Sequence, residues 1–244
     1  MTATLDQAPA TKPAVPRGKS RTRTAARRAE SARLDAARDN SLAFAARPPE
    51  PERRIGVWHK AVTHDEARPP LLWLLGCHGG AGITSLSRSL SPAADCARMW
   101  PAVLADESPF VVLVARETLE GLTRAHDVLR QYHCGQAGPG RVVLLGLITV
   151  AHQPGRVPAP IRRYRGVISE LVPEGGLWRL GWQPGWPLTP ISDLPIWTPG
   201  TPQPAKGRDP LAGIRELGEA LLTSVTAVLG GPTTPNTSPT GAQS

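Results

Sequence analysis

Short apolar runs alternate with amphipathic stretches through the middle of the 244-residue chain. The runs are rich in Val and Leu, which is typical of buried strands, and the stretches between them repeat apolar residues at helical spacing. Strands are predicted at residues 71–76, 111–115, 141–150 and 177–182, and helices at residues 84–90, 119–132 and 160–172. Strands that alternate with helices favour βαβ units and a parallel sheet. The continuous apolar run at 111–115 suits a central strand covered on both faces.

The pattern changes after the last predicted strand. Residues 184–210 hold eight prolines and are predicted to be irregular and extended. Asp209 and Pro210 then predict the start of a final helix, and Gly230 and Gly231 predict its end. The predicted apolar face of this helix consists of Leu211, Ile214, Leu217, Leu221, Val225 and Val228.

These elements predict an α/β fold, with a small and mostly parallel sheet flanked by helices in a Rossmann-like three-layer arrangement. The predicted domain occupies residues 55–230 and includes a Pro-rich extended segment at 184–208. Residues 1–54 are predicted to form a basic, Ala/Arg-rich arm, either disordered or a solvated helix, and residues 231–244 a disordered tail. The 24 glycines and 27 prolines agree with a chain of which only part is packed.

Positive charge is concentrated in the predicted arm. The formal net charge is +8, and residues 1–54 hold twelve Lys or Arg against six Asp or Glu. Such an arm is typical of contact with a polyanion or an acidic surface. The candidate residues for nucleic-acid phosphates are Arg21, Arg23, Arg27 and Arg28, which would bind without sequence preference and with strong salt dependence. A solubilising tail, or an arm that docks on a partner protein, is the alternative.

The sequence predicts a cytoplasmic protein without a transmembrane segment. Cys77, Cys96 and Cys134 are too few and too scattered for a disulfide framework or a zinc site of the CxxC type. The first residues contain no apolar stretch of the kind that a secretory signal needs. The longest apolar run, at residues 142–151, is too short to cross a bilayer.

The most informative stretch is LLWLLGCHGGAGITSL, at residues 71–86. A strand that leads through a Gly-rich loop into a helix is the context that a phosphate cradle needs, because successive backbone N–H groups can point into one concavity. The candidate residues for such a cradle are Gly79, Gly80, Gly82, Thr84 and Ser85.

This stretch resembles the Walker A motif of the ParA/MinD family of P-loop ATPases. The family motif has the form KGGxGKT, and this chain has HGGAGIT at residues 78–84. The three glycines and the threonine match, whereas His78 and Ile83 stand where the family has its two lysines. A looser resemblance extends over residues 70–230.

The resemblance implies a P-loop fold with ATP and Mg²⁺ as ligands, and this chain departs from the family in two places. The second lysine of the family contacts the β- and γ-phosphates, where Ile83 would place an apolar group. The family also has an aspartate at the end of a central strand, which orients Mg²⁺ or water, but Asp95 and Asp106 lie in no predicted strand. We therefore expect no hydrolysis, no required cofactor, and weak binding of ATP with Mg²⁺ at most.

Three functional hypotheses follow. The preferred one is a non-catalytic, ParA/MinD-like accessory protein that acts through a protein partner, such as an ATPase or a complex for DNA transfer or secretion. It would serve a plasmid, a conjugative element or a secretion system, and the Ala/Arg/Pro/Gly-rich composition resembles that of actinobacterial proteins. The second is an ATP-binding partition or positioning ATPase with an unconventional site. The third is a nucleic-acid-binding protein that acts through its basic arm.

Other clusters favour structural roles. His126 and His133 lie seven residues apart on a predicted helix, without a nearby acidic or Cys ligand, and are predicted to be a surface pair. Arg162, Arg163 and Arg165 are predicted to form a solvated helix face. Trp178, Trp182 and Trp186 are predicted to pack in the core or at a sheet edge, although a ligand platform is the alternative. The segment His78-Gly79-Gly80 also resembles an oxyanion motif of α/β-hydrolases, but no serine has the G-x-S-x-G context that this reading needs.

Overall fold

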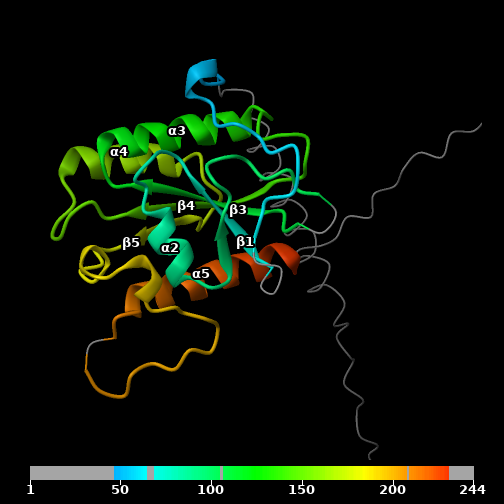
Figure 1. The fold of residues 1–244 in the computed structure, drawn as a ribbon. Helices are drawn as coiled ribbons and strands as arrows, with labels where there is room; N and C mark the ends of the chain where they lie inside the picture. Colours follow the sequence, from blue (N-terminus) through cyan, green and yellow to red (C-terminus); the bar gives the residue numbers. More distant parts are fainter. Residues whose placement is uncertain (1–46, 65–68, 105–106, 208, 231–244) are drawn as a thin grey trace, which may run out of the picture. The chain divides into compact units, whose positions relative to one another are not determined.

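Five parallel strands lie side by side in the computed structural model, in the order β2-β1-β3-β4-β5 (Figure 1). The structure describes residues 47–64, 69–104, 107–207 and 209–230. The strands are β1 (Leu72–Gly76), β2 (Ala93–Asp95), β3 (Phe110–Arg116), β4 (Val143–Val150) and β5 (Leu177–Leu180). The predicted α/β class and the predicted central position of residues 111–115 are thereby confirmed.

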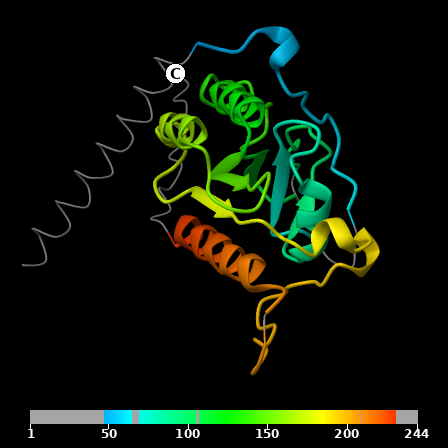
Figure 2. The same ribbon diagram turned by 90° about the vertical axis from the view of Figure 1, so that its left-hand side faces the viewer.

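In the part of the chain that the structure describes, four α-helices cover the two faces of the sheet. They are α2 (Ile83–Ser89), α3 (Leu119–His133), α4 (Ala159–Ser169) and α5 (Ala212–Leu229). Figures 1 and 2 show α3 and α4 on one face of the sheet and α2 and α5 on the other. One buried cluster joins Leu122 of α3 and Ile168 of α4 to Leu113 of β3. The other joins Leu86 of α2 and Leu217 of α5 to alternate residues of the same strands. The fold is thus a three-layer α/β sandwich.

The direction of the chain explains which helix covers which face. From β1 the chain moves outward to β2, then crosses back to β3 and moves the other way through β4 and β5. Because parallel crossovers are right-handed, a change of direction along the sheet moves the connecting helix to the opposite face. The helix α2 therefore lies opposite α3 and α4. The reversal places the switch of strand order between β1 and β3.

The strand β2 was not predicted. It has three residues and pairs only with β1, where Asp95 lies opposite Leu74. The prediction that Asp95 lies in no strand is therefore wrong. The strand was missed because its three residues are too few to show a hydrophobic periodicity. Asp106 lies outside the described residues, as do the predicted arm up to residue 46 and the predicted tail at 231–244.

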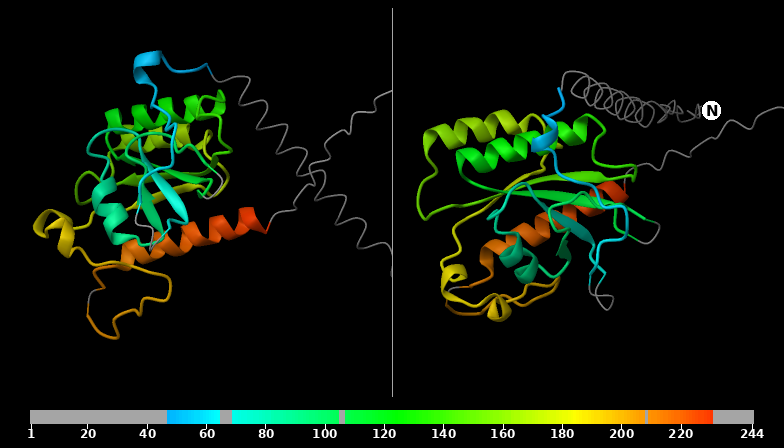
Figure 3. Two further views of the ribbon diagram at one scale, coloured as in Figure 1. Left: turned by 45° about the vertical axis from the view of Figure 1, so that its right-hand side comes forward. Right: turned by 45° about the horizontal axis from the view of Figure 1, so that its top comes forward.

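The Pro-rich segment is fastened to the body by one tryptophan. The backbone N–H of Trp197 donates to the carbonyl of Ser89, and its own carbonyl accepts from the N–H of Ser91. Its side chain is fully buried between α2 and α5. Two short 3-10 helices, η2 (Trp186–Leu188) and η3 (Ile191–Asp193), precede it. Figure 3 shows the loop that follows it extending beyond the start of α5.

The ends of the structured unit differ slightly from the predictions. A third 3-10 helix, η1 (Pro51–Arg53), lies beside α3, where Arg53 pairs with the buried Asp127 at 2.7 Å. The helix α5 begins after Leu211, and the Asp209 carboxylate accepts from the Leu211 N–H instead of capping the first turn. Val228, predicted to lie on the buried face of α5, is exposed.

None of the helices in the described parts of the chain combines the length and the apolar character needed to span a membrane.

Candidate functional site

The candidate site lies where the strand order reverses. In open parallel sheets, ligands bind in the crevice at the carboxyl ends of the strands at such a switch point. Here that crevice is bordered by the loop after β1, at residues 77–82, and by Arg116, the last residue of β3. The sequence predicted the phosphate cradle from the loop and the first turn of the helix after it.

Two glycines allow the tight course of this loop. Gly80 and Gly82 have φ angles of 78° and 93°, in the left-handed region that glycine adopts without strain. Gly82 directly precedes α2. The backbone N–H groups of Gly79, Gly80 and Gly82 have no hydrogen-bond acceptor among the described residues. Their donor capacity is therefore available to a ligand or to water.

His78 joins the loop to the end of β3. Its Nδ1 lies 2.7 Å from the Gly79 carbonyl oxygen, and its Nε2 lies 3.1 Å from the backbone N of Arg116. Since a carbonyl can only accept and a backbone N–H can only donate, Nδ1 carries the proton and the ring is neutral. His78 stands where the family has its first lysine, and here it positions the loop instead of offering a charge.

The guanidinium of Arg116 lies against the loop. Its Nε donates to the Gly80 carbonyl at 3.1 Å, and its Nη1 donates to the Ala151 carbonyl at 3.2 Å. A Cβ placed on Gly82 would meet Nη2 at 3.3 Å. Partial burial lowers the pKa of Arg116 from its ordinary value, but a guanidinium keeps its proton in proteins. A positive charge from β3 therefore lies at the edge of the loop.

Ile83 points away from the loop. It is buried in the cluster beneath α2, and its Cδ1 would lie 3.2 Å from a Cβ on Gly76. The prediction that Ile83 would place an apolar group where phosphates lie is therefore wrong. As the first residue of α2, it faces the sheet, and apolar burial holds it there.

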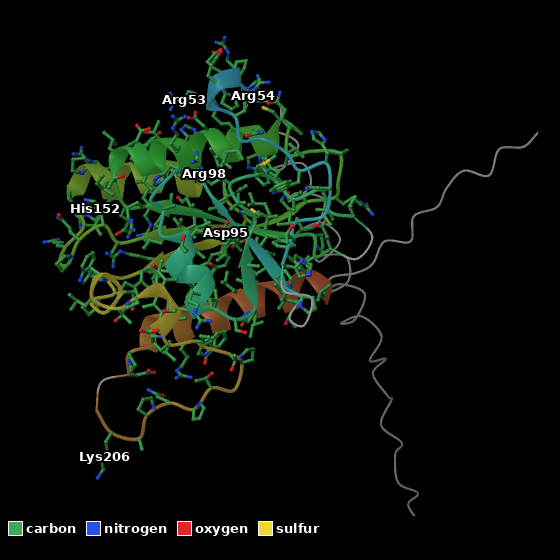
Figure 4. All side chains as sticks on the ribbon, viewed as in Figure 1. Arg53, Arg54, Asp95, Arg98, His152 and Lys206 are labelled. Carbon is green, nitrogen blue, oxygen red and sulfur yellow. The ribbon has the colours of Figure 1, made fainter. Side chains whose placement is uncertain are left out.

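A second arginine reaches the loop from the strand next to β1. Ala97 and Arg98 both have φ angles near +57°, which non-glycine residues rarely adopt. This turn carries the Arg98 side chain over the loop, so that Nη1 would lie 3.9 Å from a Cβ on Gly79. Asp95 stabilises the turn, because its carboxylate accepts from the Ala97 N–H at 2.7 Å. Figure 4 shows the labelled Asp95 and Arg98 in this region.

The remaining loop candidates have different surroundings. Thr84 is exposed and Ser85 is half-buried in the first turn of α2. Cys77, the first loop residue, is fully buried, and burial raises the pKa of its thiol to about 12. It is therefore neutral at physiological pH and is not a nucleophile. Arg88, the one basic residue of α2, donates to the Ser192 carbonyl of η3.

A cavity of about 270 Å³ and another of about 230 Å³ open on this edge of the sheet. The smaller one lies beside the loop and is lined by Ser85, Arg116, Trp182 and Trp186, among others. Trp182 and Trp186 were predicted to pack in the core or at a sheet edge. Trp178 and Trp186 are half-buried and pack against the cluster on the α5 side of the sheet, as predicted, whereas Trp182 is exposed.

The other charged clusters have structural partners. His126 lies 3.2 Å from the Tyr164 hydroxyl, and His133 donates to the Leu171 carbonyl at 2.7 Å. Both histidines are half-buried, His126 against α4 and His133 against the residues just after it, so the predicted surface pair is wrong. Arg165 turns toward Glu117 of the sheet edge, at 3.5 Å, instead of lying on a solvated face. Within the described residues, no group of His, Cys, Asp and Glu side chains is arranged to hold a metal ion.

The sequence did not predict a role for Arg98, Arg116 or Glu117 at the carboxyl edge of the sheet. The charged pair Arg116-Glu117 follows directly after a buried parallel strand, and this position marks the ligand-binding edge of such sheets. That signal was present in the sequence. Arg98 gave no comparable signal, because its place depends on β2 and on two left-handed residues.

No family model matches the chain, and no curated protein or solved structure matches it. The resemblance to the ParA/MinD family accordingly rests on the residues of the loop and on the order of the elements.

Proposed function

We propose that this protein is a non-catalytic, P-loop-like accessory protein that acts by binding and not by hydrolysis. The observation that carries the proposal is the arginine at the loop: Arg116 Nε is bonded to the Gly80 carbonyl while Ile83, at the position of the family's catalytic lysine, is buried. Phosphoryl transfer depends on mobile lysine and metal charges placed on the β- and γ-phosphates. Here the cation beside the loop is Arg116, and its guanidinium instead donates to the backbone carbonyls of Gly80 and Ala151.

The surroundings of the loop also favour a role without metal-dependent chemistry. Asp95 is the carboxylate at the end of the neighbouring strand, and its oxygen is engaged with the Ala97 N–H. Burial raises the pKa of Asp95 from its ordinary value, so its surroundings disfavour the charged form that would bind Mg²⁺. Among the described residues, nothing adds further carboxylates to make a metal site there.

An exposed apolar stretch supports action through a protein partner. Leu188 is 85% exposed, Ile191 is 49% exposed and Trp182 is 36% exposed, all within residues 182–191, where the Pro-rich segment begins. Large apolar side chains that gather on a surface mark interaction sites. We infer that η2 and η3 carry the docking surface for that partner, which we expect to be an ATPase or a complex for DNA transfer or secretion.

The cavity beside the loop favours a second candidate function, namely binding of a nucleotide without hydrolysis. Its lining combines the Arg116 guanidinium, whose Nη2 has no acceptor among the described residues, with two indole rings, Trp182 and Trp186, and with the Ser85 hydroxyl. Aromatic faces stack on nucleobases, and guanidinium groups pair with phosphates. Such binding would need neither Mg²⁺ nor a loop lysine.

The test is a hydrolysis assay on the full chain, together with calorimetric titration of ATP and ADP with and without Mg²⁺. We expect no hydrolysis above the rate without protein. Hydrolysis that depends on Mg²⁺ would overturn the non-catalytic proposal. Binding that is equally strong without Mg²⁺ would support the second candidate function, and absence of binding would exclude it.

Two single substitutions distinguish nucleotide binding from binding of the partner protein. Trp186→Ala removes a wall of the cavity and should weaken nucleotide binding at least about fivefold, given the usual worth of base stacking. Leu188→Ser lies two residues away, outside that cavity, and should leave nucleotide binding unchanged while it reduces recovery of the partner from the native host. Equal recovery of every partner with Leu188→Ser and with the unmodified chain would contradict the docking surface.

A further inference from the structure

The larger cavity at the sheet edge lies on the opposite side of β3 from the Gly-rich loop. It has a volume of about 270 Å³ and is lined by residues that follow β3 and β4 and by Arg179 of β5. Polar side chains of Glu117, His152 and Arg156 share it with the apolar side chains of Leu119 and Ile161. The cavity is therefore distinct from the loop on which the proposed function rests.

A buried carboxylate organises the base of this cavity. Glu117 is only 6% exposed, and its two oxygens accept from Arg179 Nε at 2.9 and 3.1 Å. Arg165 Nη1 lies 3.5 Å from the same carboxylate. The Thr149 hydroxyl lies 3.4 Å from it as well. Because a charge is costly to bury unless it is paired, Glu117 fixes the position of Arg179.

The cavity is left with an excess of positive charge. Two arginines face one carboxylate at its base, and Arg156 adds a third guanidinium at its wall. Among the residues that the structure describes around the cavity, Glu117 is the one carboxylate. Burial lowers the pKa of Arg165; the charge of Glu117 opposes this shift, and the neighbouring charge of Arg179 adds to it. Two positive charges therefore remain without an anion.

Several donors at the cavity have no protein acceptor. Arg179 uses Nε on Glu117, and its two terminal nitrogens have no hydrogen-bond partner among the described residues. Arg156 and His152 likewise lack a hydrogen-bond or ion-pair partner within the described parts of the chain, and both are exposed. Figure 4 shows the labelled His152 at this end of the sheet, beside α4. The start of α3 also borders the cavity, but the Thr118 side chain already caps it. The free donors at the cavity are therefore the side chains of Arg179, Arg156 and His152.

We propose that this cavity binds the phosphate group of a small molecule. The terminal nitrogens of Arg179 offer the forked geometry that phosphate oxygens accept, and Arg156 supplies the second positive charge that a dianion needs. The apolar wall formed by Leu119 and Ile161 suits a phosphate ester with a compact organic body better than free phosphate. A volume of about 270 Å³ admits a molecule of that size.

The proposal is tested by titrating the full chain with inorganic phosphate and with phenyl phosphate, using calorimetry and the NMR shifts of labelled arginine side chains. We expect phenyl phosphate to bind more tightly than inorganic phosphate. Arg156→Gln should weaken binding about tenfold, because it removes one charge-assisted hydrogen bond from an exposed side chain that no described residue depends on.

Two controls locate the bound anion. Arg163→Gln removes an equal charge from an exposed position on α4 outside the cavity and should leave the affinity unchanged. Arg98→Gln removes the cation above the Gly-rich loop and should also leave it unchanged. Loss of binding with Arg98→Gln, an effect of Arg163→Gln as large as that of Arg156→Gln, or no binding at millimolar phosphate ester would each overturn the proposal.

Discussion

A single glycine lets β4 pair with both of its neighbours. The register between β3 and β4 shifts after Val111, so that Val111 lies opposite Leu144 and Val112 opposite Gly146. Gly146 has a φ of 153°, and a Cβ on it would collide with the Gly176 carbonyl oxygen before β5. Glycine is required here because backbone approaches backbone, which a side chain would prevent.

We predict that Gly146→Ala lowers the free energy of unfolding by about 2–4 kcal/mol, because it adds a steric clash to an unfavourable backbone angle. Urea denaturation followed by circular dichroism measures the change. The matched control is Gly166→Ala in α4, where a Cβ meets nothing within 4 Å. That substitution should raise stability by roughly 0.5–1 kcal/mol. Equal effects of the two substitutions would contradict the role of Gly146.

The surroundings of Asp95 predict that the stability of the protein depends on pH. Desolvation raises the pKa of this carboxyl above its ordinary value. The folded state therefore disfavours the charged form of Asp95. At neutral pH this lowers the free energy of unfolding, and the loss disappears as the pH falls below the pKa that Asp95 has in the unfolded chain. Asp95→Asn keeps an oxygen that can accept from the Ala97 N–H. We expect it to raise the melting temperature at pH 7, with the gain shrinking toward pH 4.

Asp95→Ala serves as the control for that measurement. It removes the charge but also leaves the Ala97 N–H without its acceptor, so it should be less stable than Asp95→Asn at every pH. A melting-temperature difference between Asp95→Asn and the unmodified chain that does not change with pH would refute the explanation by desolvation.

Among the elements, α5 depends on close contact with the Pro-rich segment. A Cβ on Gly218 of α5 would overlap the ring of Trp197, the residue that fastens this segment to the end of α2. The small residue on the helix and the large one on the segment therefore fit together. Because interiors are close-packed, neither can change size without a shift of the other.

We predict that Gly218→Ala lowers stability by about 1–3 kcal/mol through overpacking. It should also increase protease cleavage between residues 198 and 210, because the segment loses its anchor. Gly213→Ala in the same helix is the control, since its Cβ would meet the flexible end of Gln183 and make an ordinary contact with Leu180. The prediction fails if both substitutions leave the cleavage rate unchanged.

At the scale of the whole molecule, stability should be distributed from the middle of the sheet outward. The strands β1, β3 and β4 pair on both sides, whereas β2 pairs through three residues with β1 alone. Amides hydrogen-bonded within a doubly covered core open only in global unfolding, while short edges open locally.

Native-state hydrogen exchange measures this distribution. We predict the slowest exchange for residues 111–115 of β3 and rates at least about a hundredfold faster for β2, consistent with local opening at a much lower free energy. Comparable protection of the two strands would contradict this distribution.

The proposed site shows which parts of a function can be predicted from residue patterns. The Gly-rich loop was found because a strand, three glycines and a helix follow each other directly in the chain. Its surroundings were not predicted, because Arg98 and Arg116 approach from other strands. The cavity with Glu117 and Arg179 joins residues 62 positions apart, and no local pattern connects them.

The sequence by itself determined the class of fold and the identity of the longer elements. Hydrophobic periodicity acts over neighbouring residues, so it located β1, β3, β4, β5 and the four α-helices. Tertiary structure alone decided the position of the short strand β2, the inward direction of Ile83 and the arginines at each cavity. Those features depend on pairing, burial and charge between distant residues, and these interactions form only when the sheet brings the carboxyl ends of its strands together.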